Sequence, residues 1–263
     1  MTQRTGPTPP PEEVKSCCAA AYSSDAATAI LGGHYHPGGT ALTRRLADRL
    51  ALRAGERVLD VAAGPGTTAF LLADEYGASV DGVDLGAATV AKARASAEAT
   101  GTCDSVRFHL GDAERLPFDD AGFDVLVCEC AFCTFPDKAT AAREFARVPR
   151  PGGRVGITDI TLQPERLDGR LRGLTGWIAC LADARPVDDY RELLADAGLH
   201  ARVVERHDGA LATMIDQIEA RLRAFRIAHV DVGTALELTA LARDAVARGD
   251  AGYVLLTADK PAP

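Results

Sequence analysis

Two acidic residues and a turn of small residues lie close together in the first half of the chain. The apolar run Val58–Val61 contains Asp60 and leads into the turn Ala62-Ala63-Gly64-Pro65-Gly66-Thr67, after which a helix pattern begins. Glycines let the backbone approach a ligand closely, and the start of a helix offers unpaired N–H groups to it. Asp84 ends the next apolar run, where a carboxylate can accept hydrogen bonds from ribose hydroxyls. The pattern predicts a nucleoside-bearing cofactor between residues 58 and 84.

The spacing of the glycines distinguishes this turn from two other classes of nucleotide-binding motif. It lacks the G-x-G-x-x-G of dinucleotide-binding folds, and Gly66 is followed by Thr67-Thr68 instead of the Lys-Ser/Thr of a phosphate-binding loop. Hydride transfer and phosphoryl transfer are therefore both disfavoured.

Composition narrows the possible partners. With 37 acidic and 29 basic residues, the 263-residue chain has a formal net charge of −8. Nucleic-acid binding requires a basic stripe, so we expect no nucleic-acid partner. No apolar run approaches the roughly 18 residues of a membrane span, and the first residues do not form a secretory leader. We therefore expect a cytoplasmic protein without a membrane partner, in which the seven cysteines are reduced thiols.

The elements that must position these residues alternate along the middle of the chain. Strand patterns are expected at 57–61, 79–84, 106–110, 123–128 and 153–159. Helix patterns are expected between them at 67–76, 89–100 and 138–147. This alternation predicts an α/β, Rossmann-like fold with a mostly parallel sheet flanked by helices.

The remaining segments flank this core. We expect a disordered tail at 1–11, an N-terminal helical cap at 12–50 that includes one helix over 12–31, the cofactor-binding core at 51–162, and a C-terminal elaboration at 163–263 that completes the sheet. Within the elaboration, helices are expected at 166–180, 187–197, 210–225 and 235–248, and strands at 201–205 and 253–259.

With these motifs in order, the chain resembles the class I S-adenosylmethionine-dependent methyltransferases over roughly residues 45 to 160. The resemblance is carried by the 60–66 turn, by Asp84 and by Gly111-Asp112-Ala113-Glu114. It implies that S-adenosylmethionine is the cofactor, with its amino-acid part at the turn and its ribose at Asp84. It also implies a set of cofactor-binding residues: Asp60, Ala62, Gly64, Gly66, Thr67, Asp84, Leu85, Asp112, Ala113 and Glu129.

A narrower resemblance is carried by cysteines. The segment from Cys128 to Lys138 is similar to the Asn-Cys-Val-x-Asn-Leu-x-x-Asp-Lys segment of arsenite methyltransferases, and Cys180-Leu-Ala-Asp-Ala-Arg-Pro is similar to their Cys-x-x-Gly-Ala-x-Pro segment. This implies that Cys130, Cys180 and an N-terminal cysteine, Cys18, bind the substrate. Glu129 departs from the family's Asn. Cys128 and Cys133 are additional thiols.

Three interpretations of the cysteines remain open. Thiolates suit trivalent arsenic, which is soft, and its lone pair can attack the sulfonium methyl group once the two are aligned. Alternatively, the acceptor is a small organic thiol or dithiol, and the cysteines exchange disulfides with it or hold a soft ion such as Zn²⁺. The possible soft-ion ligands are Cys128, Cys130, Cys133 and Cys18. In the third interpretation several cysteines are core residues, and a non-catalytic cofactor- or metalloid-binding protein is the remaining alternative.

Two further expectations concern neighbouring residues. Strand alternation predicts that Cys128 and Cys130 share one face of the sheet, with Glu129 on the other. The glycine-rich loop that carries His34, Tyr35 and His36 can close over the site and supply a proton acceptor or metal ligand, or its histidines can bond only to backbone.

Overall fold

The structure is a computed structural model that describes residues 9–166, 168–171, 176 and 179–262. Residues 1–8 of the expected disordered tail lie outside the described residues, as does part of the helix expected at 166–180. Around that gap the chain forms two short 3₁₀ turns, η2 (Pro164–Arg166) and η3 (Gly169–Leu171).

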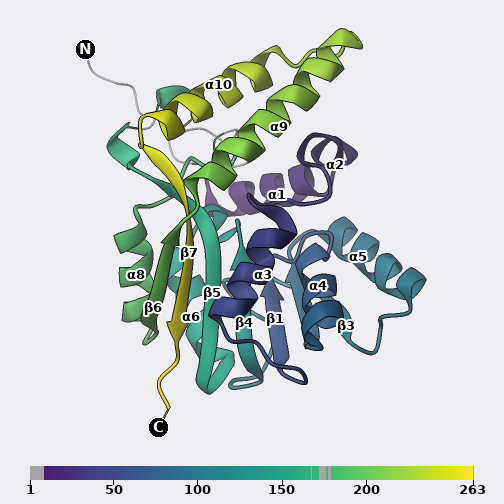
Figure 1. Cartoon of the computed structure of the whole chain (residues 1–263), viewed down its shortest axis with the longest axis vertical. Helices are drawn as coiled ribbons and strands as arrows, with labels where there is room; N and C mark the ends of the chain where they lie inside the picture. Colours follow the sequence, from purple (N-terminus) through teal and green to yellow (C-terminus); the bar gives the residue numbers. More distant parts are fainter. Residues whose placement is uncertain (1–8, 167, 172–175, 177–178, 263) are drawn as a thin grey trace.

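A single seven-stranded sheet runs through the molecule in the order β3-β2-β1-β4-β5-β7-β6 (Figure 1). Its strands are β1 (Arg57–Val61), β2 (Ser79–Asp84), β3 (Val106–Leu110), β4 (Phe123–Glu129), β5 (Pro149–Leu162), β6 (His200–Arg206) and β7 (Ala251–Asp259). The first five strands are parallel, whereas β7 is antiparallel to both β5 and β6. The mostly parallel sheet expected from the alternation is therefore confirmed.

Helices cover both faces of this sheet. On one face α3 (Gly39–Arg49), α4 (Thr67–Tyr76) and α5 (Ala87–Thr100) bury their apolar residues, while α6 (Lys138–Arg147) and α8 (Val187–Asp196) do so on the other. A strand in such a sandwich contributes alternate residues to the two cores: Val58 belongs to the first core and Leu59 to the second.

Four more helices lie toward one end of the sheet. They are α1 (Pro11–Tyr22), α2 (Asp25–Leu31), α9 (Asp208–Ile227) and α10 (Gly233–Ala247), and Figure 1 shows α9 and α10 side by side as a hairpin above α1 and α2. None of the described helices is long and apolar enough to cross a membrane.

The single helix expected over 12–31 is wrong, because the chain breaks at Ser23-Ser24. The Ser24 side chain accepts a hydrogen bond of 3.1 Å from the N–H of Ala27 and so caps the start of α2. Serine competes with helical backbone bonding in this way, which favours a new helix start over a continuous helix.

The strand order places a ligand crevice in the middle of the sheet. From β1 the chain proceeds outward through β2 and β3, and then returns to β4 on the other side of β1. The connections that follow β1 and β4 therefore leave the sheet in opposite directions. A crevice at the carboxyl ends of such strands is the usual ligand site of an open α/β sheet.

Candidate functional site

A pocket opens at this crevice, at the carboxyl ends of β1, β2 and β4. Nine of the ten predicted cofactor-binding residues line it: Asp60, Ala62, Gly64, Thr67, Asp84, Leu85, Asp112, Ala113 and Glu129. The turn after β1 bends sharply, with left-handed φ angles at Ala62 (59°), Gly64 (54°) and Gly66 (87°). This conformation leads the chain directly into α4 at Thr67.

Asp84 fixes the shape of the turn. Its two carboxylate oxygens accept hydrogen bonds from the backbone N–H groups of Gly64 (2.9 Å) and Gly86 (2.8 Å). Burial raises the pKa of Asp84, and these two bonds oppose that rise. Each oxygen keeps further acceptor capacity on the pocket wall, which suits a ligand that carries hydroxyl groups.

Asp60 contributes a buried oxygen that has no hydrogen-bond partner among the described residues. Its side chain is 2% exposed, and burial raises its pKa well above the ordinary value, with further contributions from the negative charges of Glu129 and Asp84. Because an unpaired buried polar group is costly, this oxygen fits a pocket that receives the polar, partly cationic end of a ligand.

The tenth predicted residue, Gly66, lies behind the pocket wall. A Cβ atom at this position would overlap the ring of Phe108 and lie 3.0 Å from the ring of Phe70. Gly66 therefore serves the site by letting the turn pack against two aromatic rings.

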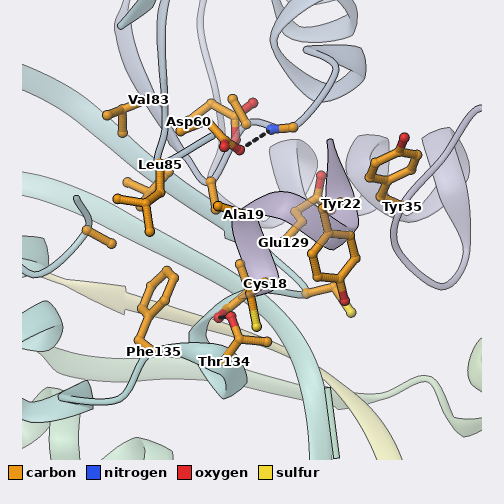
Figure 2. A pocket seen from close by; sticks show the side chains of 18 of the residues that line it. Cys18, Ala19, Tyr22, Tyr35, Asp60, Val83, Leu85, Glu129, Thr134 and Phe135 are labelled. Atoms are coloured by element: carbon orange, nitrogen blue, oxygen red, sulfur yellow. Dashed lines mark hydrogen bonds between the residues drawn. The ribbon is translucent and has the colours of Figure 1, made fainter. Parts of the chain in front are cut away.

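Helix α1 crosses the open side of the pocket. Four of its residues, at positions i, i+3, i+4 and i+7, line the pocket: Lys15, Cys18, Ala19 and Tyr22. Figure 2 shows Cys18, Ala19 and Tyr22 on this helix, with Asp60, Val83 and Leu85 toward one end of the pocket and Thr134 and Phe135 toward the other. Of these four residues only Cys18 is predicted from the sequence, although the helical spacing of all four is a signal that they share one face.

Lys15 joins α1 to the end of the pocket formed by the segment after β3. Its ammonium group donates to the carboxylates of Asp112 at 2.8 Å and Glu114 at 2.5 Å. Asp112 also accepts from the N–H of Glu114 at 2.9 Å. These bonds hold the helix over the two residues, Asp112 and Ala113, that the resemblance assigns to the adenine.

Three thiols meet at the other end of the pocket, where Cys130 lines the pocket and Cys133 and Cys180 are buried next to it. The Cys180 thiol forms hydrogen bonds with the thiols of Cys130 and Cys133, which lower its pKa well below the ordinary value. The Tyr22 hydroxyl lies 3.1 Å from the Cys180 sulfur. Cys18 lines the pocket from α1, and burial raises its pKa to about 12. The structure therefore brings Cys130 and Cys180 together beside the pocket.

The expectation that Cys128 and Cys130 share a face is wrong. Strand β4 ends at Glu129, and Cys130 has a left-handed φ of 55° that turns its side chain out of the alternation. Cys128 is fully buried in the core beneath α6 and α8, whereas Cys130 packs against the opposite core.

Cys128 is thus separated from the possible soft-ion ligands Cys130 and Cys133. In the described part of the chain, the His, Cys, Asp and Glu side chains form no group of three or more that is arranged to hold a metal ion.

Glu129 lies at the centre of a polar network between the two ends of the pocket. Its carboxylate accepts from the hydroxyls of Thr68 (2.6 Å) and Thr43 (3.0 Å). The Nε2 atom of His36 lies 3.6 Å from the same oxygen. His36 and Tyr35 both line the pocket, so the glycine-rich loop does reach the site.

Asp159 lies behind the thiols and gives a testable dependence of stability on pH. It is fully buried, accepts from the N–H groups of Cys133 (2.9 Å) and Ile160 (2.7 Å), and burial raises its pKa from an ordinary 3.8 to about 7. The folded protein therefore keeps a proton that the unfolded chain has released, so this residue lowers the unfolding free energy as pH rises from about 4 to 7.

We expect the unfolding free energy of the wild type to fall by about 2 kcal/mol more than that of Asp159→Asn between pH 5.5 and 7.0. Urea denaturation of both proteins at the two pH values measures this difference, and the other titrating groups cancel in it. Equal falls for the two proteins would contradict the buried, protonated state of Asp159.

Comparison with known proteins assigns the fold and its pocket to a family. Residues 58–153 match the family described as a methyltransferase domain. The chain is 35% identical to methyltransferase GfsG of Streptomyces halstedii over 85% of this chain and 81% of the relative. It is 32% identical to the 27-O-demethylrifamycin SV methyltransferase of Amycolatopsis mediterranei over 84% of each protein.

A third relative covers less of the chain. An arsenite methyltransferase of Halobacterium salinarum is 36% identical over 57% of this chain and 39% of that protein. The matches that span more than four fifths of both proteins decide the family. The chain belongs to the class I S-adenosylmethionine-dependent methyltransferases.

Proposed function

We propose that the protein methylates a soft nucleophile at the thiol end of the pocket, and that this nucleophile is trivalent arsenic. The observation that supports the proposal most is the cluster of Cys130, Cys133 and Cys180, in which hydrogen bonds from the other two thiols lower the pKa of Cys180. Thiolates are the ligands that a soft, three-coordinate centre prefers.

In this proposal the cofactor lies along the turn after β1. Asp84 holds its ribose, Asp112 and Ala113 flank its adenine, and Asp60, Gly64 and Glu129 surround its amino-acid end. The orphaned Asp60 oxygen and the left-handed Gly64 suit such a ligand. S-adenosylmethionine supplies an electrophilic methyl group when it is bound.

The cysteines hold and orient the acceptor. The thiols of Cys130 and Cys180 each replace one hydroxyl of arsenous acid. In each replacement an arsenic–sulfur bond forms and an arsenic–oxygen bond breaks. The released hydroxyl takes up the thiol proton and leaves as water. Cys18, which enters the pocket from α1, or a small solution thiol supplies the third bond. The remaining lone pair on arsenic is then the group to be aligned with the methyl carbon.

An organic acceptor is the competing candidate. A small thiol or dithiol would bind at the same end of the pocket, where its own sulfur would accept the methyl group and release its proton. An oxygen acceptor is favoured by the likeness to the 27-O-demethylrifamycin SV methyltransferase, which spans 84% of this chain against 57% for the arsenite methyltransferase. The His36 imidazole beside Glu129 is a candidate proton acceptor for a hydroxyl substrate.

A turnover assay with mass-spectrometric product detection separates these acceptors. The purified protein is incubated with S-adenosylmethionine and, separately, with arsenite, small thiols and dithiols, and phenols and alcohols. Methylated arsenicals support the proposal. Methyl thioethers or methyl ethers without an arsenic product would replace it with the corresponding competitor.

The variant Cys130→Ser tests the role of the cluster. We expect at least a tenfold loss of arsenite methylation, because a hydroxyl is a harder ligand than a thiolate, with unchanged affinity for S-adenosylmethionine. Cys103→Ser is the matched control, since Cys103 is exposed and lies outside the pocket. Arsenite methylation at the wild-type rate by Cys130→Ser would rule out its role as a ligand.

A further inference from the structure

Two of the cysteines at the thiol end of the pocket have backbone conformations that residues with a Cβ atom disfavour. The φ angle is 55° at Cys130 and 61° at Cys180. Such left-handed conformations are costly, and they persist where the surrounding structure holds them. The Cys180 sulfur nevertheless lies 3.7 Å from the carbonyl oxygen of Cys130, fifty positions earlier in the chain. Each of the two segments therefore needs an anchor that holds it in place.

The segment that contains Cys130 and Cys133 is anchored to strand β5. The N–H of Cys130 donates to the carbonyl oxygen of Thr158 at 2.6 Å, and the N–H of Cys133 donates to the Asp159 carboxylate at 2.9 Å. Both acceptors belong to β5, which is an interior strand of the sheet. The position of this first segment is therefore set by the sheet itself.

A buried ion pair connects the second segment to the first. The ammonium group of Lys138, the first residue of α6, donates to the Asp183 carboxylate at 2.6 Å. It also donates to the carbonyl oxygens of Cys133 at 2.8 Å and Phe135 at 3.0 Å. Asp183 follows Cys180 closely in the sequence. A single ammonium group thus bonds both to the segment after Cys130 and to the segment after Cys180.

Burial makes the geometry of this ion pair strict. The exposed fraction of the side chain is 5% for Lys138 and 20% for Asp183. A buried ammonium group that loses its carboxylate keeps a desolvated charge, so displacement of Asp183 is unfavourable. The two residues line a separate surface hollow together with residues of α6 and α8, outside the cofactor pocket. They can therefore act on the pocket only through the segments that they join.

We propose that the ion pair between Lys138 and Asp183 positions Cys180 against Cys130, and so sets the geometry of the thiol pair beside the pocket. Lys138 and Asp183 are positioning residues, because they act through the two cysteines. For methyl transfer the inference rests on the proposed function, in which these thiols hold the acceptor. The spacing of the two thiols is a separate property that can be measured without turnover.

Phenylarsine oxide is a probe of this spacing, because it bonds to two thiols at once. Two arsenic–sulfur bonds form, the arsenic–oxygen bond breaks, and the oxygen leaves as water with both thiol protons. Its affinity is measured for the whole protein as wild type, Asp183→Ala, Cys180→Ser and the double variant. We expect Asp183→Ala to weaken binding about tenfold, because the probe must then order a thiol that the ion pair otherwise holds in place. Once Cys180 is replaced, the same substitution should have no effect.

Matched variants separate positioning from a general loss of structure. Asp183→Glu keeps the carboxylate and should retain the wild-type affinity for the probe. Glu56→Ala removes an ion pair with Arg154 that lies before β1, at the opposite end of the strand from the pocket, and should also bind the probe as the wild type does. Asp183→Ala should retain the wild-type affinity for S-adenosylmethionine. If the alanine variant does not fold, Asp183→Ser repeats the comparison, since its hydroxyl is too short to reach the ammonium group.

The outcomes distinguish this inference from the proposed function. An equal loss of affinity with and without Cys180, or wild-type affinity in a folded Asp183→Ala protein, would overturn the positioning role. If both proposals hold, Asp183→Ala also raises the KM for arsenite about tenfold. A wild-type protein that binds phenylarsine oxide through Cys180 and does not methylate arsenite would overturn the proposed function and support the positioning role.

Discussion

Replacing Asp84 with alanine should weaken the binding of S-adenosylmethionine by about 1,000-fold. The carboxylate holds the N–H groups of Gly64 and Gly86 in place, and it is the proposed acceptor for the ribose hydroxyls. A hydrogen bond to a charged group contributes about 1.5–3 kcal/mol. The loss of two ribose bonds accordingly costs about 4 kcal/mol, or three orders of magnitude in affinity. Calorimetric titration of the purified variant measures the loss.

Asp81→Ala is the matched control for this experiment. Asp81 lies on the same strand, β2, but its carboxylate bonds to His109 at 2.7 Å, away from the pocket. We expect its affinity for the cofactor to remain within about threefold of the wild type. If Asp84→Ala bound the cofactor as tightly as Asp81→Ala, the assigned role in ribose binding would be wrong.

Replacing Gly66 with alanine should lower the unfolding free energy by about 3 kcal/mol or more. The φ angle of 87° is a left-handed conformation that costs an alanine about 1–2 kcal/mol. The new Cβ would also overlap the Phe108 ring, and overpacking of this kind costs about 1–3 kcal/mol. Equilibrium denaturation in urea gives the difference directly.

Gly101→Ala separates the two contributions. Gly101 has a left-handed φ of 68°, and a Cβ built there meets no atom within 4 Å. Gly101→Ala should therefore lower the unfolding free energy only by the conformational contribution, about 1–2 kcal/mol. If the two variants lost the same unfolding free energy, the Phe108 ring would have moved aside for the new Cβ at no energetic cost.

Much of the fold could be predicted from the sequence because its local signals agree with its packing. The helix Thr67–Tyr76 follows a glycine turn and ends at Gly77, and both of its predicted ends match the structure. The break at Ser23-Ser24 was missed because the small residues on either side are all compatible with a continuous helix. The outcome there depends on the capping bond made by Ser24.

The candidate site could be predicted where the residues are close in sequence. The turn at 60–66 and Asp84 lie on adjacent strands, so their meeting follows from the parallel sheet. The contact between Cys180 and Cys130 spans fifty positions, and only the resemblance pointed to it. The backbone reversal at Cys130 depends on where β4 ends, which side-chain alternation does not reveal. Thr43 and Thr68 reach Glu129 from two separate helices, an arrangement with no local sequence signal.

Helix α1 makes direct bonds at both ends of the pocket, to Asp112 and Glu114 through Lys15 and to Cys180 through Tyr22. Helix α1 is thus bonded to residues at the proposed adenine end of the pocket and at the proposed acceptor end. Movement of α1 away from the pocket would break the bonds of Lys15 and of Tyr22 together, and would open both ends of the pocket at the same time. We therefore expect that exchange of the cofactor and release of the methylated product both require movement of this helix.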